Sequence, residues 1–440
     1  MRKNWTVGLI LLVIFAGGTA WGQALQEALT LEESIKIALE KNLRLHAARE
    51  GVVGSEYRRK AAKTDFLPRW IGQYSYTRYN DPVNVGFVQA ADPSGRVLST
   101  SRDLYNLTTT VSQPLFTGGS ILSNYRLEKF GVEISKVDVE TVKMDIVVQV
   151  REGYFNILRA EKIVDVAKQA VKQFEAQLEV AKAFFEVGIT PKNDLLQSEV
   201  RLANARQALV SVENDLAIAK SSFNILLRRE INEPLSIVDI LEYKPSVLRL
   251  EESLEEALRQ RPEIKSAGLK VSQAKEDVKI AKSGFFPALN LAGNYNRFSE
   301  ELGLNGDYTS ERWTIQALVT ITLGDWGKTG YKVGENKVKV TQAEDSRVQL
   351  IEGIILEVKQ DYLNMSTAER NIGVAEKSIE QAEENLRMNE ERYKYQVATA
   401  TDVLDAVTLL AQARVNYYGA LSDFNIARAR LERAMGRMYP

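Results

Sequence analysis

An apolar seam with coiled-coil spacing runs along two stretches of the chain and limits what the chain can fold into. In alternating steps of four and three residues, the seam covers residues 146–185 and again residues 354–393. No charged side chain falls on the first seam, and only Asp361 and Asn389 interrupt the second. This spacing is typical of helices that pack side by side. Helical patterning over residues 120–187 predicts a rod of about 100 Å, too long for an ordinary globular domain.

Shorter helices with the same kind of seam flank the long ones. Residues 193–227 follow the first long helix, and residues 30–66 form a predicted helix of similar length near the start of the chain. Two such helices placed end to end would match one long helix in length. We therefore expect the short helices to stack in pairs beside the long ones.

The sequence contains an internal repeat, so the chain consists of two similar halves. The letters LEES at residues 31–34 return at residues 250–253, and GYFN at residues 153–156 returns as DYLN at residues 361–364. Each half has the order helix, two strands, long helix, helix.

The boundary between the halves is predicted where prolines interrupt any helix, near residues 232–245. This gives a first structural repeat at residues 23–240 and a second at residues 241–440.

The first residues are typical of a targeting segment. Two basic residues, a short apolar run and a cluster of small residues predict a signal peptide at residues 1–22. The alternative is a buried N-terminal helix, but no periodic pattern links this segment to the rest. We therefore expect the protein to be exported.

Composition excludes several classes of function. The 440 residues carry a formal net charge of −1, so no basic excess points to nucleic acid. The chain has no cysteine and a single histidine, His46, for which we expect a structural role. Thiol catalysis, a Ser-His-Asp triad and the common zinc sites therefore lack their residues. We expect no enzyme activity, no cofactor and no metal site.

Four segments alternate apolar and polar side chains as β-strands do. They are residues 69–79, 105–112, 289–296 and 313–323. An apolar face opposite an uncharged polar face is typical of a strand between lipid and water, although a soluble half-buried sheet alternates in the same way. The smallest closed membrane barrels have eight strands, so a barrel would need several chains, and three chains would supply twelve strands.

This order of elements resembles the outer membrane efflux protein family, the TolC-like outer membrane factors. The likeness is carried by LTLEES at residues 29–34, by the Phe-Leu-Pro and Phe-Phe-Pro strand entries at residues 66–68 and 285–287, by QPLF with GG within residues 113–119, and most of all by TDVLDA at residues 401–406.

The resemblance implies an α+β membrane protein that works as a homotrimer. Its long coiled-coil helices would form an α-helical barrel in the periplasm, and its strands, four per chain, a transmembrane β-barrel in the lipid of the outer membrane of a Gram-negative bacterium. It implies an exit duct for efflux or type I secretion, working with a periplasmic adaptor (membrane fusion) protein and an inner-membrane pump. The alternative is an exported periplasmic coiled-coil scaffold without channel activity, which explains the heptads but not the strand faces.

Two acidic residues, Asp402 and Asp405, lie one turn apart where the last helix begins. The resemblance implies that they line a closed periplasmic gate, where a trimer would form rings of three carboxylates that favour cations and repel one another. The alternative is complementation of the helix dipole. It is stronger for Asp402, whose repeat counterpart Asp194 is also acidic, than for Asp405, whose counterpart is Gln197.

The two turns after the long helices are predicted to be plain helix hairpins, and the resemblance implies that they also face the adaptor. In the first turn we expect Gly188 to adopt a left-handed conformation, Thr190 to be the helix N-cap and Pro191 the first helical residue. Gln396 stands where the first turn has Gly188, so the two turns are predicted to differ in shape. The adaptor-facing residues are Val187, Gly188, Ile189, Thr190, Gln396, Val397, Ala398 and Thr399.

Aromatic side chains of the strands are candidates for membrane-interface girdles, because such rings favour the headgroup region. Ordinary packing within a soluble sheet is the alternative. The candidates are Trp70, Tyr74, Tyr76, Tyr295 and Trp313.

Overall fold

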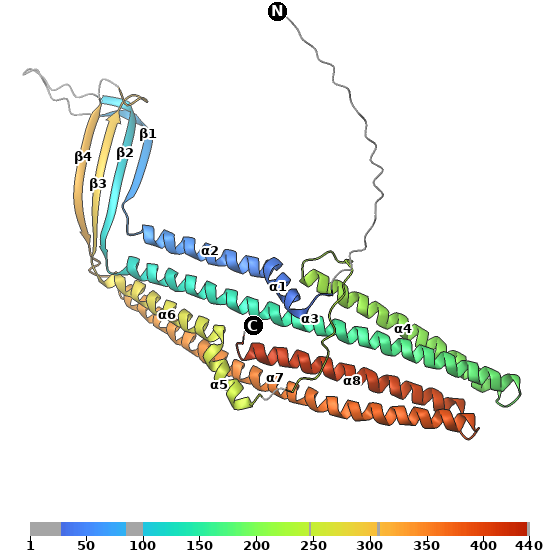
Figure 1. Cartoon of the computed structure of the whole chain (residues 1–440). Helices are drawn as coiled ribbons and strands as arrows, with labels where there is room; N and C mark the ends of the chain where they lie inside the picture. The colour runs from blue at the N-terminus through green and yellow to red at the C-terminus, as the bar shows by residue number, and fades with distance from the viewer. Residues whose placement is uncertain (1–27, 85–99, 246–247, 306–308, 438–440) are drawn as a thin grey trace, which may run out of the picture.

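The computed structural model describes residues 28–84, 100–245, 248–305 and 309–437. It shows a layer of long helices with one sheet rising from one end (Figure 1). The predicted signal peptide at residues 1–22 lies outside the described residues. The elements are α1 (Leu31–Lys41), α2 (Leu43–Thr64), β1 (Arg69–Asn84), β2 (Thr100–Thr117), α3 (Ser120–Glu186), α4 (Lys192–Leu226), α5 (Leu250–Gln260), α6 (Pro262–Lys282), a 3-10 turn (Ser283–Phe285), β3 (Ala288–Ser299), β4 (Ser310–Thr320), α7 (Lys328–Lys394) and α8 (Ala400–Ala434).

The two long helices are confirmed. Helices α3 and α7 each contain 67 residues, and α3 ends one residue before the predicted end. Most seam side chains point into the helix layer, where Ile146, Ile157 and Val358 are fully buried. Phe185, at the end of the first seam, is exposed. The seam therefore drives the packing of α3 and α7 that its spacing predicts.

The short helices stack end to end beside the long ones, as expected. In the half nearest the sheet, α3 packs between α2 and α6, and α6 packs on α7. In the other half, α3 packs between α4 and α8, and α8 packs on α7 (Figure 1). Helices α3 and α7 therefore run through both halves.

The predicted single helix over residues 30–66 is broken, which corrects that expectation. Asn42 has extended backbone at φ −68° and ψ 126°, and its side chain accepts the amides of Arg44 at 2.8 Å and Leu45 at 3.3 Å. This local cap competes with the continuing helix. In the second repeat the same break falls at Arg261, because Pro262 disfavours helical backbone at the residue before it.

The four strands form one antiparallel sheet in the order β1-β2-β3-β4. Strand β4 ends at Thr320, so Ile321 and Leu323, which were expected in the strand, lie beyond it. Within the described residues, β1 and β4 are each paired on one side only.

Three buried apolar clusters hold the helix layer together. One surrounds Tyr154 and Phe223, one surrounds Ile354 and Phe424, and one surrounds Leu404 near the far end of the layer. Among the helices described, none is both long and apolar enough to cross a membrane.

Candidate functional site

One face of the sheet carries a ladder of uncharged polar side chains. Across β2 and β3, the Thr108 hydroxyl donates to Asn296 at 2.8 Å and the Thr110 hydroxyl donates to Asn294 at 2.9 Å. The Asn294 amide reaches Thr314 on β4 at 3.5 Å. These groups partner one another and keep lone pairs for water, so this face suits an aqueous surface.

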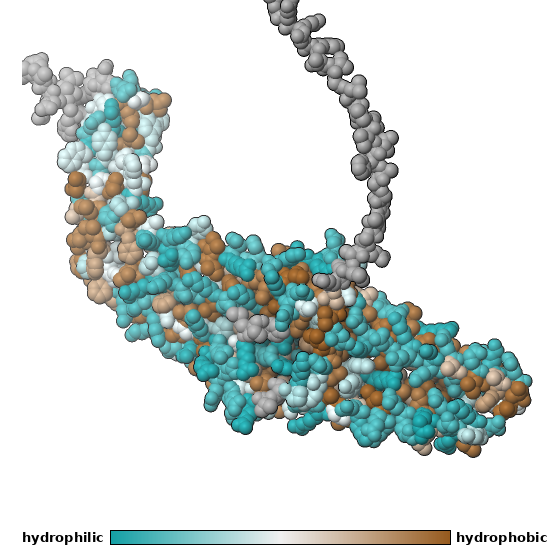
Figure 2. All heavy atoms as spheres, viewed as in Figure 1, coloured by the Kyte–Doolittle hydropathy of each residue, from teal (hydrophilic) through white to brown (hydrophobic). Residues whose placement is uncertain are grey.

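The opposite face brings the five candidate aromatic residues together. The strand register places Trp70, Tyr74 and Tyr76 on the same face as Tyr295, which lies opposite Trp313. Trp70 and Trp313 are 78% and 72% exposed, and apolar residues gather over the part of the sheet nearest the helices (Figure 2). Their contact with lipid headgroups stays a prediction.

The first tip, between α3 and α4, is a left-handed turn around Gly188. Gly188 has φ +77°, and its amide donates to the carbonyl of Phe185 at 3.0 Å. The expected capping is wrong by one residue, because Pro191 has extended backbone with ψ 155° and is itself the N-cap. The Thr190 hydroxyl is buried and caps nothing. Val187 and Ile189 stay exposed.

The second tip, between α7 and α8, has the same backbone. Gln396 has φ +60°, and its amide donates to the carbonyl of Tyr393 at 3.0 Å, just as Gly188 does in the first tip. The expectation that the tips differ in shape is therefore wrong for the backbone. Left-handed backbone is permissive for glycine and strained for glutamine, so the helix ends on both sides impose the turn. Val397 is 63% exposed at the apex.

Asp402 caps the start of α8. Its carboxylate accepts the amide and the hydroxyl of Thr399, each at 2.8 Å, and the Thr399 hydroxyl accepts the amide of Asp402 at 3.3 Å. These hydrogen bonds, that of the Thr399 backbone first, lower the pKa of Asp402 from its ordinary value. The capping alternative therefore describes the local contacts of Asp402.

Asp405 instead links α8 to α4. The Arg201 guanidinium donates to the Asp405 carboxylate at 2.8 Å, and both side chains are about half exposed. One turn closer to the tip, the Thr401 hydroxyl donates to Gln197 at 2.5 Å. Helices α4 and α8 otherwise make few direct contacts, so these two side-chain pairs add polar links near the tips to the apolar packing of α3 on α8 that joins the two hairpins.

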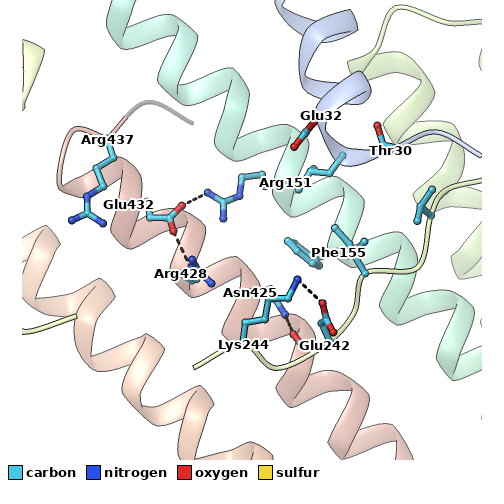
Figure 3. Close-up of a pocket in the computed structure, with 13 residues that line it drawn as sticks. Thr30, Glu32, Arg151, Phe155, Glu242, Lys244, Asn425, Arg428, Glu432 and Arg437 are labelled. Carbon is cyan, nitrogen blue, oxygen red and sulfur yellow. Dashed lines mark hydrogen bonds and ion pairs between the residues drawn. The ribbon is translucent and has the colours of Figure 1, made fainter. Parts of the chain in front are cut away.

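The middle of the helix layer, called the waist below, contains charged residues that the sequence patterns did not single out. A cavity of about 700 Å³ lies between α3, α8 and the segment after α4, and Arg151 and Phe155 of α3 point into it (Figure 3). Arg151 and Arg428 both donate to Glu432 of α8. Arg428 lies four residues before Glu432 on the same helix, but Arg151 lies 281 residues away in the sequence, so no local spacing indicates its contact with Glu432.

Asp361 is half-buried near this waist, on the seam of α7. Burial, reinforced by the neighbouring Glu357 carboxylate, raises the pKa of Asp361 to about 6 against the opposing effect of Arg430 and Arg433. In the sequence, the only indication of this residue was that Asp361 interrupts the apolar seam with a polar side chain.

The model of the outer membrane efflux protein family matches residues 34–225 and 253–437. The chain belongs to this family. It is an outer-membrane efflux channel of a Gram-negative bacterium, with most of its chain in the periplasm.

Individual relatives of this efflux channel are distant but cover much of its length. The outer membrane protein TolC of Vibrio cholerae is 23% identical over 348 residues, 76% of this chain and 77% of the relative. The outer membrane efflux protein BepC of Brucella suis is 22% identical over 434 residues, 97% of this chain and 89% of the relative. Among solved structures, the CmeC outer membrane channel of Campylobacter jejuni has a TM-score of 0.79 at 19% identity and covers 99% of this chain and 94% of its own.

The family is one of channels and not of enzymes. The alternative of a periplasmic scaffold without channel activity is therefore set aside.

Proposed function

We propose that three copies of this efflux channel close into one exit duct, each supplying the two repeats at residues 23–240 and 241–440. The continuous polar face of the sheet carries this proposal, because it would line the water-filled interior while the aromatic face meets lipid. A four-stranded sheet cannot remain open in lipid, where its edge groups find no water. Pairing β4 of one copy with β1 of the next satisfies both edges.

The helix layer supports the same closure. Its outer helices expose apolar side chains, Val200 and Val210 on α4 and Leu356 and Val374 on α7, all at 59% or more. Packing α7 of one copy against α2 and α4 of the next would cover them and extend the layer into a ring.

The tips are the proposed docking points for a periplasmic adaptor protein, which would connect the duct to an inner-membrane pump. Apolar residues at both tips support this role, since Val187 is 69% exposed and Val397 is 63% exposed on the same kind of turn. Gly188, Ile189, Thr190, Gln396, Ala398 and Thr399 complete the proposed docking surface.

We further propose that the pair of Asp405 and Arg201 holds the periplasmic end closed. Three carboxylates brought near a common axis repel one another, and the Arg201 guanidinium offsets that repulsion. Asp402 contributes by fixing the start of α8, which positions Asp405 one turn later.

The test is single-channel conductance of the purified trimer in planar bilayers. One exposed ion pair contributes about 0.2–1 kcal/mol, so the loss of three pairs shifts the opening equilibrium by about threefold to a hundredfold. Arg201→Gln should open more often and stay cation-selective, because the carboxylates remain. Asp405→Asn should lose cation selectivity and open less often than Arg201→Gln, because it removes the carboxylate repulsion together with the ion pair.

Arg206→Gln is the matched control. Arg206 donates to Glu175 at 2.8 Å in an equally exposed pair on the same helix, but it bonds to α3 instead of α8. Unchanged opening in the control and in both gate variants would refute the gate. A detergent-purified protein with the mass of one chain that never conducts would refute the trimeric duct.

A further inference from the structure

Trp326 is displayed on a rigid turn between β4 and α7. It is 99% exposed and has left-handed backbone at φ +54°. The Asp325 carboxylate accepts the amides of Gly327 at 3.0 Å and Thr329 at 2.8 Å, and thereby fixes the turn. The turn therefore holds a large apolar side chain in a strained conformation and leaves it fully exposed to solvent. Such a side chain indicates a surface that binds a partner.

The first repeat contains the same turn with a small residue in that place. Gly118 and Gly119 precede α3 with φ +63° and +88°, and Trp326 and Gly327 precede α7 with φ +54° and +86°. Gly118 therefore corresponds to Trp326.

Gly118 is covered by the segment between α6 and β3, where the second repeat passes from helix to strand. A Cβ added to Gly118 would lie 2.6 Å from the carbonyl oxygen of Ser283 and 3.0 Å from the Cβ of Phe286. The turn before α3 thus supports the start of β3 in close backbone contact.

The segment that corresponds to Ser283–Phe286 at the other end of the chain is the passage from α2 to β1, at residues 64–67. Leu67 takes the place of Phe286 and is 58% exposed, and Phe66 is 42% exposed. Helix α3 packs between α2 and α6, whereas at the sheet end α7 has α6 on one side and no described helix on the other. By analogy with α3, the repeat predicts that α2 of a second copy packs on the free side of α7.

We propose that Trp326 docks on the passage from α2 to β1 of the neighbouring copy, against Leu67 of that copy. The inference rests on the proposed trimer and adds a named contact between its subunits. A side chain at the Gly118 position has no room within the chain, so the junction between copies must be wider than the junction between repeats. At the level of these turns, the ring then has three-fold symmetry. Narrow junctions between the repeats of one chain alternate with wide junctions between neighbouring chains.

The absence of cysteine from the chain allows a direct test by disulfide crosslinking. In the repeat that serves as template, the added Cβ of Gly118 lies 3.0 Å from the Cβ of Phe286, and the wider junction between copies moves the corresponding atoms toward the distance of about 3.5–4.5 Å that a disulfide needs between Cβ atoms. Trp326→Cys combined with Leu67→Cys, oxidised with copper phenanthroline in native outer membranes, should shift the denatured band from the mass of one chain to that of several. Each single variant should stay at the mass of one chain.

Gly284→Cys with Thr329→Cys is the matched control. The added Cβ of Gly284 lies 3.8 Å from the Cβ of Thr329 in the same chain, so this pair should lose its free thiols while keeping the mass of one chain. The reduced Trp326→Cys/Leu67→Cys variant must have the native mass of the wild-type trimer, which verifies that it folds.

The outcomes separate the two proposals. A native mass of one chain would refute the trimer, whereas a trimer without crosslinks, alongside a working control, would refute the docking of Trp326. Strong quenching by brominated phosphatidylcholine, in a variant whose other tryptophans are phenylalanine, would show that Trp326 faces lipid and would also refute the docking.

Discussion

Asp361→Asn should stabilise the channel at neutral pH and leave it unchanged in acid. The ordinary pKa of this carboxyl is 3.8, and burial raises it to about 6 in the folded chain. The folded state therefore binds the Asp361 proton more tightly than the unfolded state, and stability falls as pH rises from about 4 through 6. A shift of about two pKa units corresponds to about 3 kcal/mol, which partial exposure and nearby arginines reduce to about 1–2 kcal/mol. Asparagine keeps the shape and removes the charge.

The assay is thermal unfolding of the detergent-purified protein at pH 4 and pH 8, followed by loss of helical circular dichroism. At pH 8 the variant should melt about 2–4 °C above wild type, and at pH 4 the two should coincide. Asp345→Asn, at an exposed position on the same helix, is the control and should change neither value. A variant that melts below wild type at pH 8 would show that the Asp361 charge is stabilising and would refute the argument.

Four further substitutions test local packing and backbone strain, by thermal unfolding and, for Gln396→Gly, by amide exchange as well. Gly153→Ala should destabilise by about 1–3 kcal/mol, because its Cβ would lie 2.7 Å from the ring of Phe223, whereas Gly373→Ala, which has open space, should stabilise slightly. Tyr154→Phe should cost about 0.5–1.5 kcal/mol, because the hydroxyl lies within hydrogen-bond distance of two backbone carbonyls of the segments that cross the waist. Gln396→Gly should relieve about 1 kcal/mol of left-handed strain and slow amide exchange at the second tip, so faster exchange would contradict the assigned turn.

The long helices were predictable because their signals are local and repeated. The seam extends over about eleven turns of α3, and glycines with left-handed backbone stand near both ends of the helix, so its start was predicted correctly and its end to within one residue. The alternation in the strands likewise predicted which side chains share a face. The repeat boundary at residues 240–241 stays a prediction.

The remaining features depend on contacts that spacing does not encode. The break at Asn42 comes from a side chain that satisfies two amides, a choice that a helical pattern does not exclude. The ion pairs of Arg201 with Asp405 and of Arg151 with Glu432 join residues that only the fold brings together. Trp326 could have been recognised by aligning its turn with Gly118 and Gly119, since the two turns hold the same place before a long helix.

The open edges of the sheet also decide when folding can finish. A chain with all its described elements in place still has rows of backbone donors and acceptors on β1 and β4 that no strand of the same chain pairs. Each such group is costly in hydrocarbon, so in the trimer proposed above complete insertion has to wait until copies meet. The last step of maturation is then a collision between molecules, and its rate rises more steeply than in direct proportion to the number of chains in the envelope. A protease that removed unassembled chains would compete with this step, so a lower rate of synthesis would then reduce the yield of finished channels more than proportionately.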